Sequence, residues 1–162
     1  MTWQSSVTYY REINQTVQDR LGADHSAKIA LYSVDFEEIA EVHRNGNWPE
    51  AGHILADAGL KLKAAGADFL LMATNTMHLV AEDVIQATEL PFLHIAEVTA
   101  DALLANGIKK VALTGTRFTM ELPFYSEILA KRGLEVMIPN HDQRDFIHQT
   151  IYEELGHGIL KE

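Results

Sequence analysis

Two short segments carry hydroxyl and amide side chains where the sequence changes from apolar to polar. Thr74-Asn75-Thr76 follows the apolar run of residues 68–72, and Thr114-Gly115-Thr116 follows the apolar run of residues 110–113. In a parallel α/β sheet, ligands bind where strands end at their carboxyl ends and helices begin. Hydroxyls and free backbone N–H groups at such junctions can bind a carboxylate or a phosphate.

The same residues have a second interpretation, because Thr and Asn are also common N-caps of helices. Either junction taken alone fits a helix cap better than a ligand site. The two together, with the polar opening Thr2-Trp3-Gln4, favour a ligand site. Both interpretations stay open at the level of the sequence.

The elements that position these junctions follow from apolar periodicity. Helices are expected over residues 5–20, 36–43, 48–65, 77–87, 98–105, 120–132 and 144–155, and buried strands over residues 28–34, 68–72, 91–95, 110–113 and 134–138. This alternation indicates an α/β fold with a parallel sheet flanked by helices. Because the chain opens on a helix and has no closing strand, we expect a fold that is incomplete at both ends. A complete five-stranded domain that begins with a helix is the alternative.

Composition limits the classes of function. The 162 residues carry a net charge of −10, which disfavours nucleic acid and anionic lipid as partners. There is no cysteine, so disulfides, thiolate nucleophiles and cysteine-based metal sites are excluded from this chain. We expect a cytoplasmic protein with no membrane association, since no apolar run is long enough to span a bilayer and no signal peptide precedes the first helix.

The histidines raise the question of a metal or an acid–base role. His141 and His148 share a helix face only if their helix begins early, and no metal-binding pattern accompanies them, so no metal site is expected. His78 and His94 are expected to orient a loop by hydrogen bonding. Arg44 is expected to be a solvated surface residue, although it could reach the carboxylate of a substrate side chain.

The blocks around these junctions resemble the aspartate/glutamate racemase family. The run Thr74-Asn75-Thr76-Met77-His78 after an apolar strand is similar to the family's strand-end motif. Further similar blocks occur in the family's order across essentially the whole chain: MTWQSS (1–6), YYR (9–11), SVDF (33–36), PFLHIA (91–96) and LTGTRFTM (113–120).

The resemblance implies an amino-acid racemase made of two similar α/β lobes with the substrate between them. Residues 1–95 would form the N-terminal lobe, lacking its first strand, and residues 96–162 part of the second lobe. The resemblance also implies a homodimer that needs no cofactor or metal and acts on a small amino acid or carboxylate. In the family two cysteines, one from each lobe, remove and return the proton at the α-carbon. By position, the substrate contacts would be Met1, Trp3, Thr74, Asn75, Thr76 and Thr116.

Three departures from the family pattern bear on activity. The resemblance places the first catalytic cysteine at Ala73, where a methyl group cannot carry a proton. The second cysteine would lie beyond Glu162, and the family's first strand would lie before Met1. We therefore expect the chain to be inactive as a racemase, whether Ala73 is an engineered trap or a natural loss of two-base chemistry. The alternative function is a non-catalytic domain that binds a small carboxylate and retains the family's substrate cradle.

Overall fold

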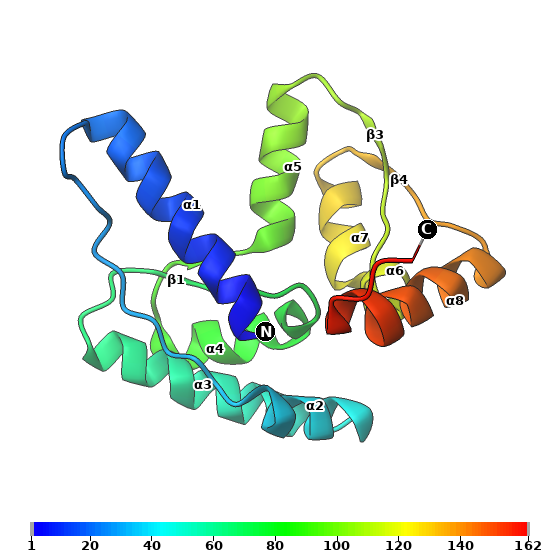
Figure 1. The fold of residues 1–162 in the computed structure, drawn as a ribbon, viewed down its shortest axis with the longest axis horizontal. Coiled ribbons are helices and arrows are strands. Elements are labelled where there is room, and N and C mark those ends of the chain that lie inside the picture. The colour runs from blue at the N-terminus through cyan, green and yellow to red at the C-terminus, as the bar shows by residue number, and fades with distance from the viewer. Residues whose placement is uncertain (1, 162) are drawn as a thin grey trace. The chain divides into compact units, whose positions relative to one another are not determined.

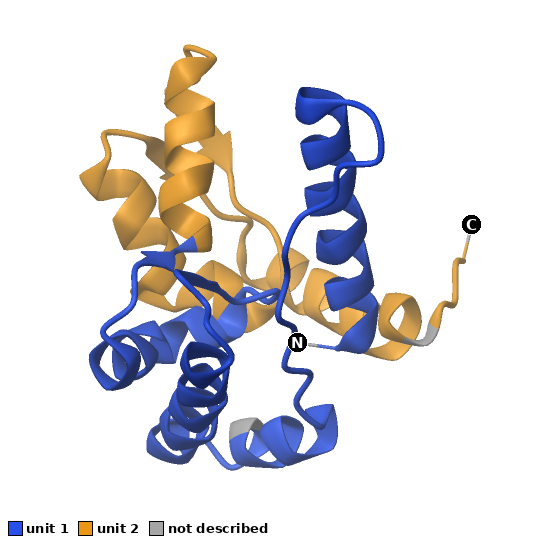
Figure 2. Cartoon of the chain, turned by 90° about the vertical axis from the view of Figure 1, so that its left-hand side faces the viewer, with its two compact units in different colours: residues 1–94 blue, residues 95–162 orange. Residues whose placement is uncertain are grey.

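The computed structural model describes residues 2–161, except for the side chains of His43 and His157. The chain divides into two compact units, residues 1–94 and residues 95–162 (Figure 2). No helix of the described part of the chain is long and apolar enough to cross a membrane.

The first unit is a small parallel sheet with helices around it (Figure 1). Its helices are α1 (Trp3–Leu21), α2 (Phe36–Arg44), α3 (Trp48–Ala64), the 3₁₀ turn η1 (Thr76–Val80) and α4 (Ala81–Thr88). Strands β1 (Leu70–Leu71) and β2 (Phe92–Leu93) pair in parallel, with Leu70 opposite Phe92 and Leu71 opposite Leu93.

Local signals explain the limits of α3. The Asn47 side chain accepts a hydrogen bond from the Glu50 N–H at 3.4 Å, and Pro49 lies in the first turn, where its missing N–H costs nothing. Past the other end, Gly66 has φ +89°, a conformation that stops the helix and suits glycine. These limits agree with the helix predicted over residues 48–65.

The core of the first unit forms where α3 packs against α4 and β1. Its buried members are Ile39, Ala51, Leu55, Leu70, Met77, Val80 and Val84. Gly59 permits the close approach of the two helices, because a Cβ atom there would lie 2.8 Å from Cγ2 of Thr88.

The strand predicted over residues 28–34 is absent, and that prediction is wrong. The segment has no regular secondary structure and pairs with none of the described strands, and Leu31 and Tyr32 are 59% and 43% exposed. A strand needs a neighbour for its backbone hydrogen bonds. The apolar pattern indicated burial, but none of the described strands pairs with this segment.

The second unit is built in the same manner from a two-stranded parallel sheet and helices. Its elements are α5 (Ile95–Ala105), β3 (Lys110–Ala112), α6 (Arg117–Glu121), α7 (Pro123–Lys131), β4 (Glu135–Met137), α8 (His141–Gln149), the π turn η2 (Thr150–Glu154) and the 3₁₀ turn η3 (Leu155–His157). Val111 lies opposite Val136 in the sheet. The buried core consists of Ala96, Ala100, Tyr125, Leu129 and Leu134.

Three helix predictions in this unit need correction. The helix expected over residues 98–105 begins three residues earlier, at Ile95, as α5. The single helix expected over residues 120–132 is broken into α6 and α7, because Leu122 precedes Pro123 and takes the extended conformation that proline imposes on its neighbour. The last helix begins at His141 instead of Arg144. There the Asn140 side chain accepts from the Gln143 N–H at 3.0 Å and Gln143 Oε1 accepts from the Asn140 N–H at 3.1 Å, a reciprocal capping box.

Candidate carboxylate-binding site

The junction after β1 is a tight turn that leads directly into η1. The Thr74 N–H donates to the carbonyl of Met72 at 2.9 Å, a three-residue turn with Ala73 at its centre. Asn75 follows and is exposed, while Thr74 and Thr76 are half-buried. The Asn75 side chain makes no capping hydrogen bond. The helix-cap interpretation therefore does not account for Asn75.

His78 supports this turn from the protein interior. It is 3% exposed, and its Nδ1 lies 3.2 Å from the carbonyl oxygen of Asn75. Because a carbonyl only accepts, Nδ1 is the protonated nitrogen of the neutral ring. Burial, and to a lesser extent the neighbouring His94, lower the pKa of His78 to about 4. At neutral pH the His78 side chain is therefore uncharged and supports the turn through its hydrogen bond to the Asn75 carbonyl.

His94 lies beside His78 and completes a small cluster of rings. The centroids of the two imidazoles are 4.5 Å apart, and the ring of Phe92 lies 5.7 Å from that of His78. The packing is edge-to-face, a favourable arrangement for aromatic rings. The His78 contact with Asn75 is the loop-orienting hydrogen bond that the sequence analysis expected.

The junction after β3 differs in an important respect. Leu113 continues the sheet by donating its N–H to the Met137 carbonyl at 2.8 Å, and Gly115 then turns the chain. The Thr116 hydroxyl accepts the Thr119 N–H at 3.5 Å, so Thr116 is an N-cap of α6. Here the helix-cap interpretation holds.

A second group of side chains covers the same helix end. The Arg117 N–H donates to Nδ1 of His148 at 3.2 Å, and the Arg117 guanidinium forms an ion pair with Asp145 at 2.8 Å. Burial and the Arg117 charge lower the pKa of His148 below its usual value. This group was not predicted from the sequence. The signal that could have found it is the spacing of Asp145 and His148, three apart on one helix face.

The remaining predicted contacts lie at the amino end of the chain. Trp3 is the first residue of α1 and is 65% exposed. Met1 lies outside the described residues. Thr74, Asn75 and Thr76 are adjacent within the first unit, whereas Thr116 belongs to the second, so their joining in one site stays a prediction.

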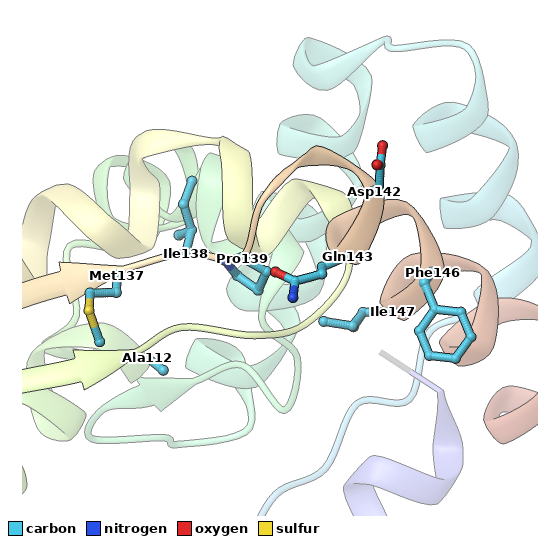
Figure 3. A pocket seen from close by; sticks show the side chains of 8 residues that line it. All are labelled: Ala112, Met137, Ile138, Pro139, Asp142, Gln143, Phe146 and Ile147. Atoms are coloured by element: carbon cyan, nitrogen blue, oxygen red, sulfur yellow. The ribbon is translucent and has the colours of Figure 1, made fainter.

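Each unit also contains a cavity lined mainly by apolar side chains. In the first unit the cavity measures about 850 Å³ and is bordered by Ala73. In the second unit a groove of about 650 Å³ runs beside β3, β4 and α8 (Figure 3), lined by Ala112, Met137, Ile138, Pro139, Asp142, Gln143, Phe146 and Ile147. Neither lining includes Thr74, Asn75, Thr76 or Thr116.

The structure also shows where the histidines and Arg44 considered as metal ligands or substrate contacts lie. Within residues 2–161, side chains of His43 and His157 aside, no three histidine or acidic groups are placed to hold a metal ion. His141 lies 3.3 Å from Asp145 through Nδ1. Arg44 forms an exposed ion pair with Glu37 at 2.6 Å. Arg44 is therefore a solvated surface residue in this structure.

Comparison with known proteins gives consistent results. A model of the Asp/Glu/hydantoin racemase family matches residues 1–158. The broad specificity amino-acid racemase RacX of Bacillus subtilis is 31% identical over 120 residues, which cover 63% of this chain and 52% of RacX. The chain thus spans about half the length of this curated relative.

Two solved structures extend the comparison to the fold. A candidate Asp/Glu racemase from Yersinia pestis is 48% identical with a TM-score of 0.93, over 99% of this chain and 70% of that one. An aspartate racemase homologue from Pyrococcus horikoshii is 32% identical with a TM-score of 0.84, over the same shares. The α/β fold expected from the sequence is confirmed by these matches.

Proposed function

Because the chain belongs to the Asp/Glu/hydantoin racemase family, we propose that it binds a small amino acid by its α-carboxylate but does not complete racemisation. The binding element of this proposal is the turn formed by Thr74, Asn75 and Thr76. The observation that carries it is that Asn75 is exposed and its side chain caps no helix, while its backbone carbonyl is held by His78.

The turn supplies the donors that a carboxylate needs. The Asn75 amide and the hydroxyls of Thr74 and Thr76 belong to one short segment, so binding requires no rearrangement that brings distant parts of the chain together. These groups are neutral, and the chain carries a net charge of −10. Hydrogen bonds from the turn must therefore attract the acid against the overall field, and we expect weak binding.

The proposed lack of turnover rests on the absence of a proton carrier. Ala73, at the centre of the turn, has only a methyl group, and the 162 residues include no cysteine. His78 is a titratable group in contact with the turn, but it is buried and its Nδ1 is bound to the carbonyl of Asn75. A general base must reach the proton that it removes. We therefore expect His78 to take no part in proton transfer.

The test combines ligand binding with proton exchange. L- and D-aspartate and L- and D-glutamate are each added at millimolar concentration, and Tm is measured. Loss of the α-proton signal in D₂O is followed by ¹H NMR. We expect at least one of these ligands to raise Tm, Asn75→Ala to remove the rise, and no α-proton exchange. Absence of any shift would contradict binding, and exchange by the unaltered chain would contradict the proposed inactivity.

Cysteine variants test where a thiol acts. Ala73→Cys should introduce α-proton exchange from one face, and Ala105→Cys, on the exposed end of α5 in the second unit, is the control for a thiol outside the turn. Thr74→Cys is the neighbouring control within the turn. Exchange by the Thr74 variant alone would show that the reactive position is Thr74 and that Ala73 has been misassigned.

The alternative proposal, a domain that only binds small carboxylates, makes a different prediction for these variants. In that case binding persists in Ala73→Cys, but neither Ala73→Cys nor Thr74→Cys exchanges the α-proton. Both proposals place carboxylate binding at the turn of Thr74, Asn75 and Thr76. They differ in whether the α-carbon of the bound ligand lies next to this turn.

A further inference from the structure

The pair Asn-Gly occurs twice in the chain, each time directly after a helix. Asn45-Gly46 follows α2 in the first unit, and Asn106-Gly107 follows α5 in the second. In both pairs the asparagine is exposed and the glycine has a positive φ, +65° at Gly46 and +72° at Gly107. Because glycine has no Cβ, its backbone nitrogen can approach the amide of the side chain before it. The two pairs therefore share the same local chemistry and can be compared within one molecule.

Hydrogen bonds hold both of the groups that would react in the second pair. The Asn106 side-chain amide donates to the carbonyl of Ala102 at 2.8 Å. The Gly107 N–H donates to the carbonyl of Leu104 at 2.9 Å. Attack of the glycine nitrogen on the amide carbon requires both groups to leave these partners first. The carboxyl end of α5 therefore protects Asn106.

The first pair has neither of these restraints. Among the residues that the structure describes, none forms a hydrogen bond with the Asn45 side chain or with the Gly46 N–H. The Asn45 N–H donates to the carbonyl of Glu41 at 3.1 Å, so the main chain is ordered up to this residue. The Asn45 amide and the Gly46 nitrogen can therefore approach each other without breaking a hydrogen bond.

We propose that Asn45-Gly46 is a self-modification site, at which the folded chain converts Asn45 to isoaspartate and thereby loosens α2, while Asn106 is preserved. The Gly46 nitrogen forms a bond with Cγ of Asn45. The bond from Cγ to Nδ2 breaks, and ammonia leaves with the proton that the Gly46 nitrogen loses.

Water then opens the resulting cyclic imide at either of its two carbonyl carbons. Opening at Cγ gives aspartate. Opening at the backbone carbonyl carbon leaves the main chain running through Cγ, which is isoaspartate. The whole sequence consumes one water molecule and releases one ammonia molecule, and no group is oxidised or reduced. Because it requires no ligand, the reaction is independent of the proposed amino-acid binding.

The contacts around Asn45 indicate what the product does to the fold. Isoaspartate adds one carbon atom to the main chain between Asn45 and Gly46. The Asn47 N–H donates to the carbonyl of Val42 at 3.0 Å across this segment, so the added atom separates a bonded pair at the end of α2. This helix supplies Ile39, which is 1% exposed, to the core of the first unit. We therefore expect the modified chain to be less stable.

The experiment follows both pairs in one sample. The unaltered chain is incubated in its folded state at pH 8 in water enriched in ¹⁸O, and samples taken at intervals are digested in ordinary water. The ¹⁸O label marks conversion that occurred before digestion. Peptides that contain Asn45 and Asn106 are compared by mass spectrometry, with fragmentation that distinguishes aspartate from isoaspartate. A parallel incubation contains enough urea to unfold the chain.

In the folded chain Asn45 should convert about 30-fold faster than Asn106, the factor expected when a reaction must first break two hydrogen bonds of ordinary net strength. In urea the two rates should become similar. Equal rates in the folded chain would overturn the proposal, and so would an Asn45 that reacts only in urea. Aspartate as the sole product would also overturn it, because isoaspartate forms only from the cyclic imide.

Two matched variants test the site by a second readout. Asn45→Gln should remove most of the ammonia that the folded chain releases, because glutamine would have to close a larger ring. Asn106→Gln should leave the release unchanged. An equal effect of the two variants would contradict the selective reaction at Asn45.

The loosening of α2 has its own control. Asn45→Asp carries the charge of the product on an unaltered main chain and should keep the Tm of the original chain. The isoaspartate form, separated after incubation, should melt about 3 °C lower, the change expected from the loss of one hydrogen bond in a chain of this size. The same Tm for the isoaspartate form and Asn45→Asp would overturn the proposed loosening.

Discussion

At the scale of single residues, two similar-looking polar turns behave differently because of what their side chains already bind. The Thr116 hydroxyl is occupied by the Thr119 N–H, whereas Asn75 makes no cap and is held only through its backbone by His78. A hydroxyl at a helix start is thus no evidence for a ligand until its partner is known. The turn at Asn75 is the better candidate for recognition.

The difference between the two turns can be measured as stability. Thr116→Ala should lower the free energy of unfolding by about 1 kcal/mol, because it removes a cap, and Thr116→Ser should restore most of it. Asn75→Ala should stay within about 0.5 kcal/mol of the original chain. Urea unfolding of the three variants checks this. A larger loss for Asn75→Ala than for Thr116→Ala would mean that Asn75 has a structural role.

The buried His78 should make stability depend on pH. Its pKa is lowered to about 4 in the folded protein from about 6.5 in the unfolded chain, so the unfolded chain binds more protons between these values. Stability is then complete above about pH 6.5 and falls as the pH is lowered towards 4, by roughly 3 kcal/mol for this group.

Urea unfolding between pH 4 and 7 tests this dependence. His78→Gln should flatten the profile, since glutamine keeps a donor for the Asn75 carbonyl but does not titrate. His25→Gln, at an exposed position, is the control and should leave the profile unchanged. A His78 variant with the same pH slope as the original chain would show that another group is responsible.

At the scale of elements, close packing of α3 on α4 requires a glycine. Gly59→Ala should destabilise the first unit by about 1–3 kcal/mol, because the new Cβ would overlap Cγ2 of Thr88 and nearby Cγ1 of Val84. Adding Thr88→Ser removes the nearer methyl group and keeps the hydroxyl that donates to the Val84 carbonyl at 2.7 Å. The double variant should recover part of the loss in thermal unfolding, and no recovery would contradict a steric cause.

Elements with local signals were predictable from the sequence, and those that depend on distant partners were not. Asn47, Pro49 and Gly66 determine α3 almost residue by residue. Residues 28–34 carry an equally clear apolar pattern, but pairing requires a second strand that the pattern cannot identify. The break between α6 and α7 was not predicted, although the sequence carries its signal, since Pro123 disfavours a helical conformation in Leu122.

At the scale of the whole molecule, the sequence blocks led to the correct family and fold class. The match of the family model over residues 1–158 and the two solved relatives confirm both. The site was only partly predictable. The two junctions could be located from the sequence. Whether a side chain there caps a helix, as Thr116 does, or makes no capping hydrogen bond, as with Asn75, could not be predicted, because the answer depends on atoms that folding brings close together.

The open edge along residues 28–34 also affects how copies of the protein behave in concentrated solution. A row of unpaired backbone donors and acceptors is a template on which a second molecule can add its own strand. Lys28 is the only charged side chain in that segment, so little along the edge itself discourages such stacking. The net charge of −10 then becomes the main safeguard, because like-charged molecules repel one another. Salt weakens that repulsion, so storage at high ionic strength favours fibrous or amorphous aggregates over dispersed molecules.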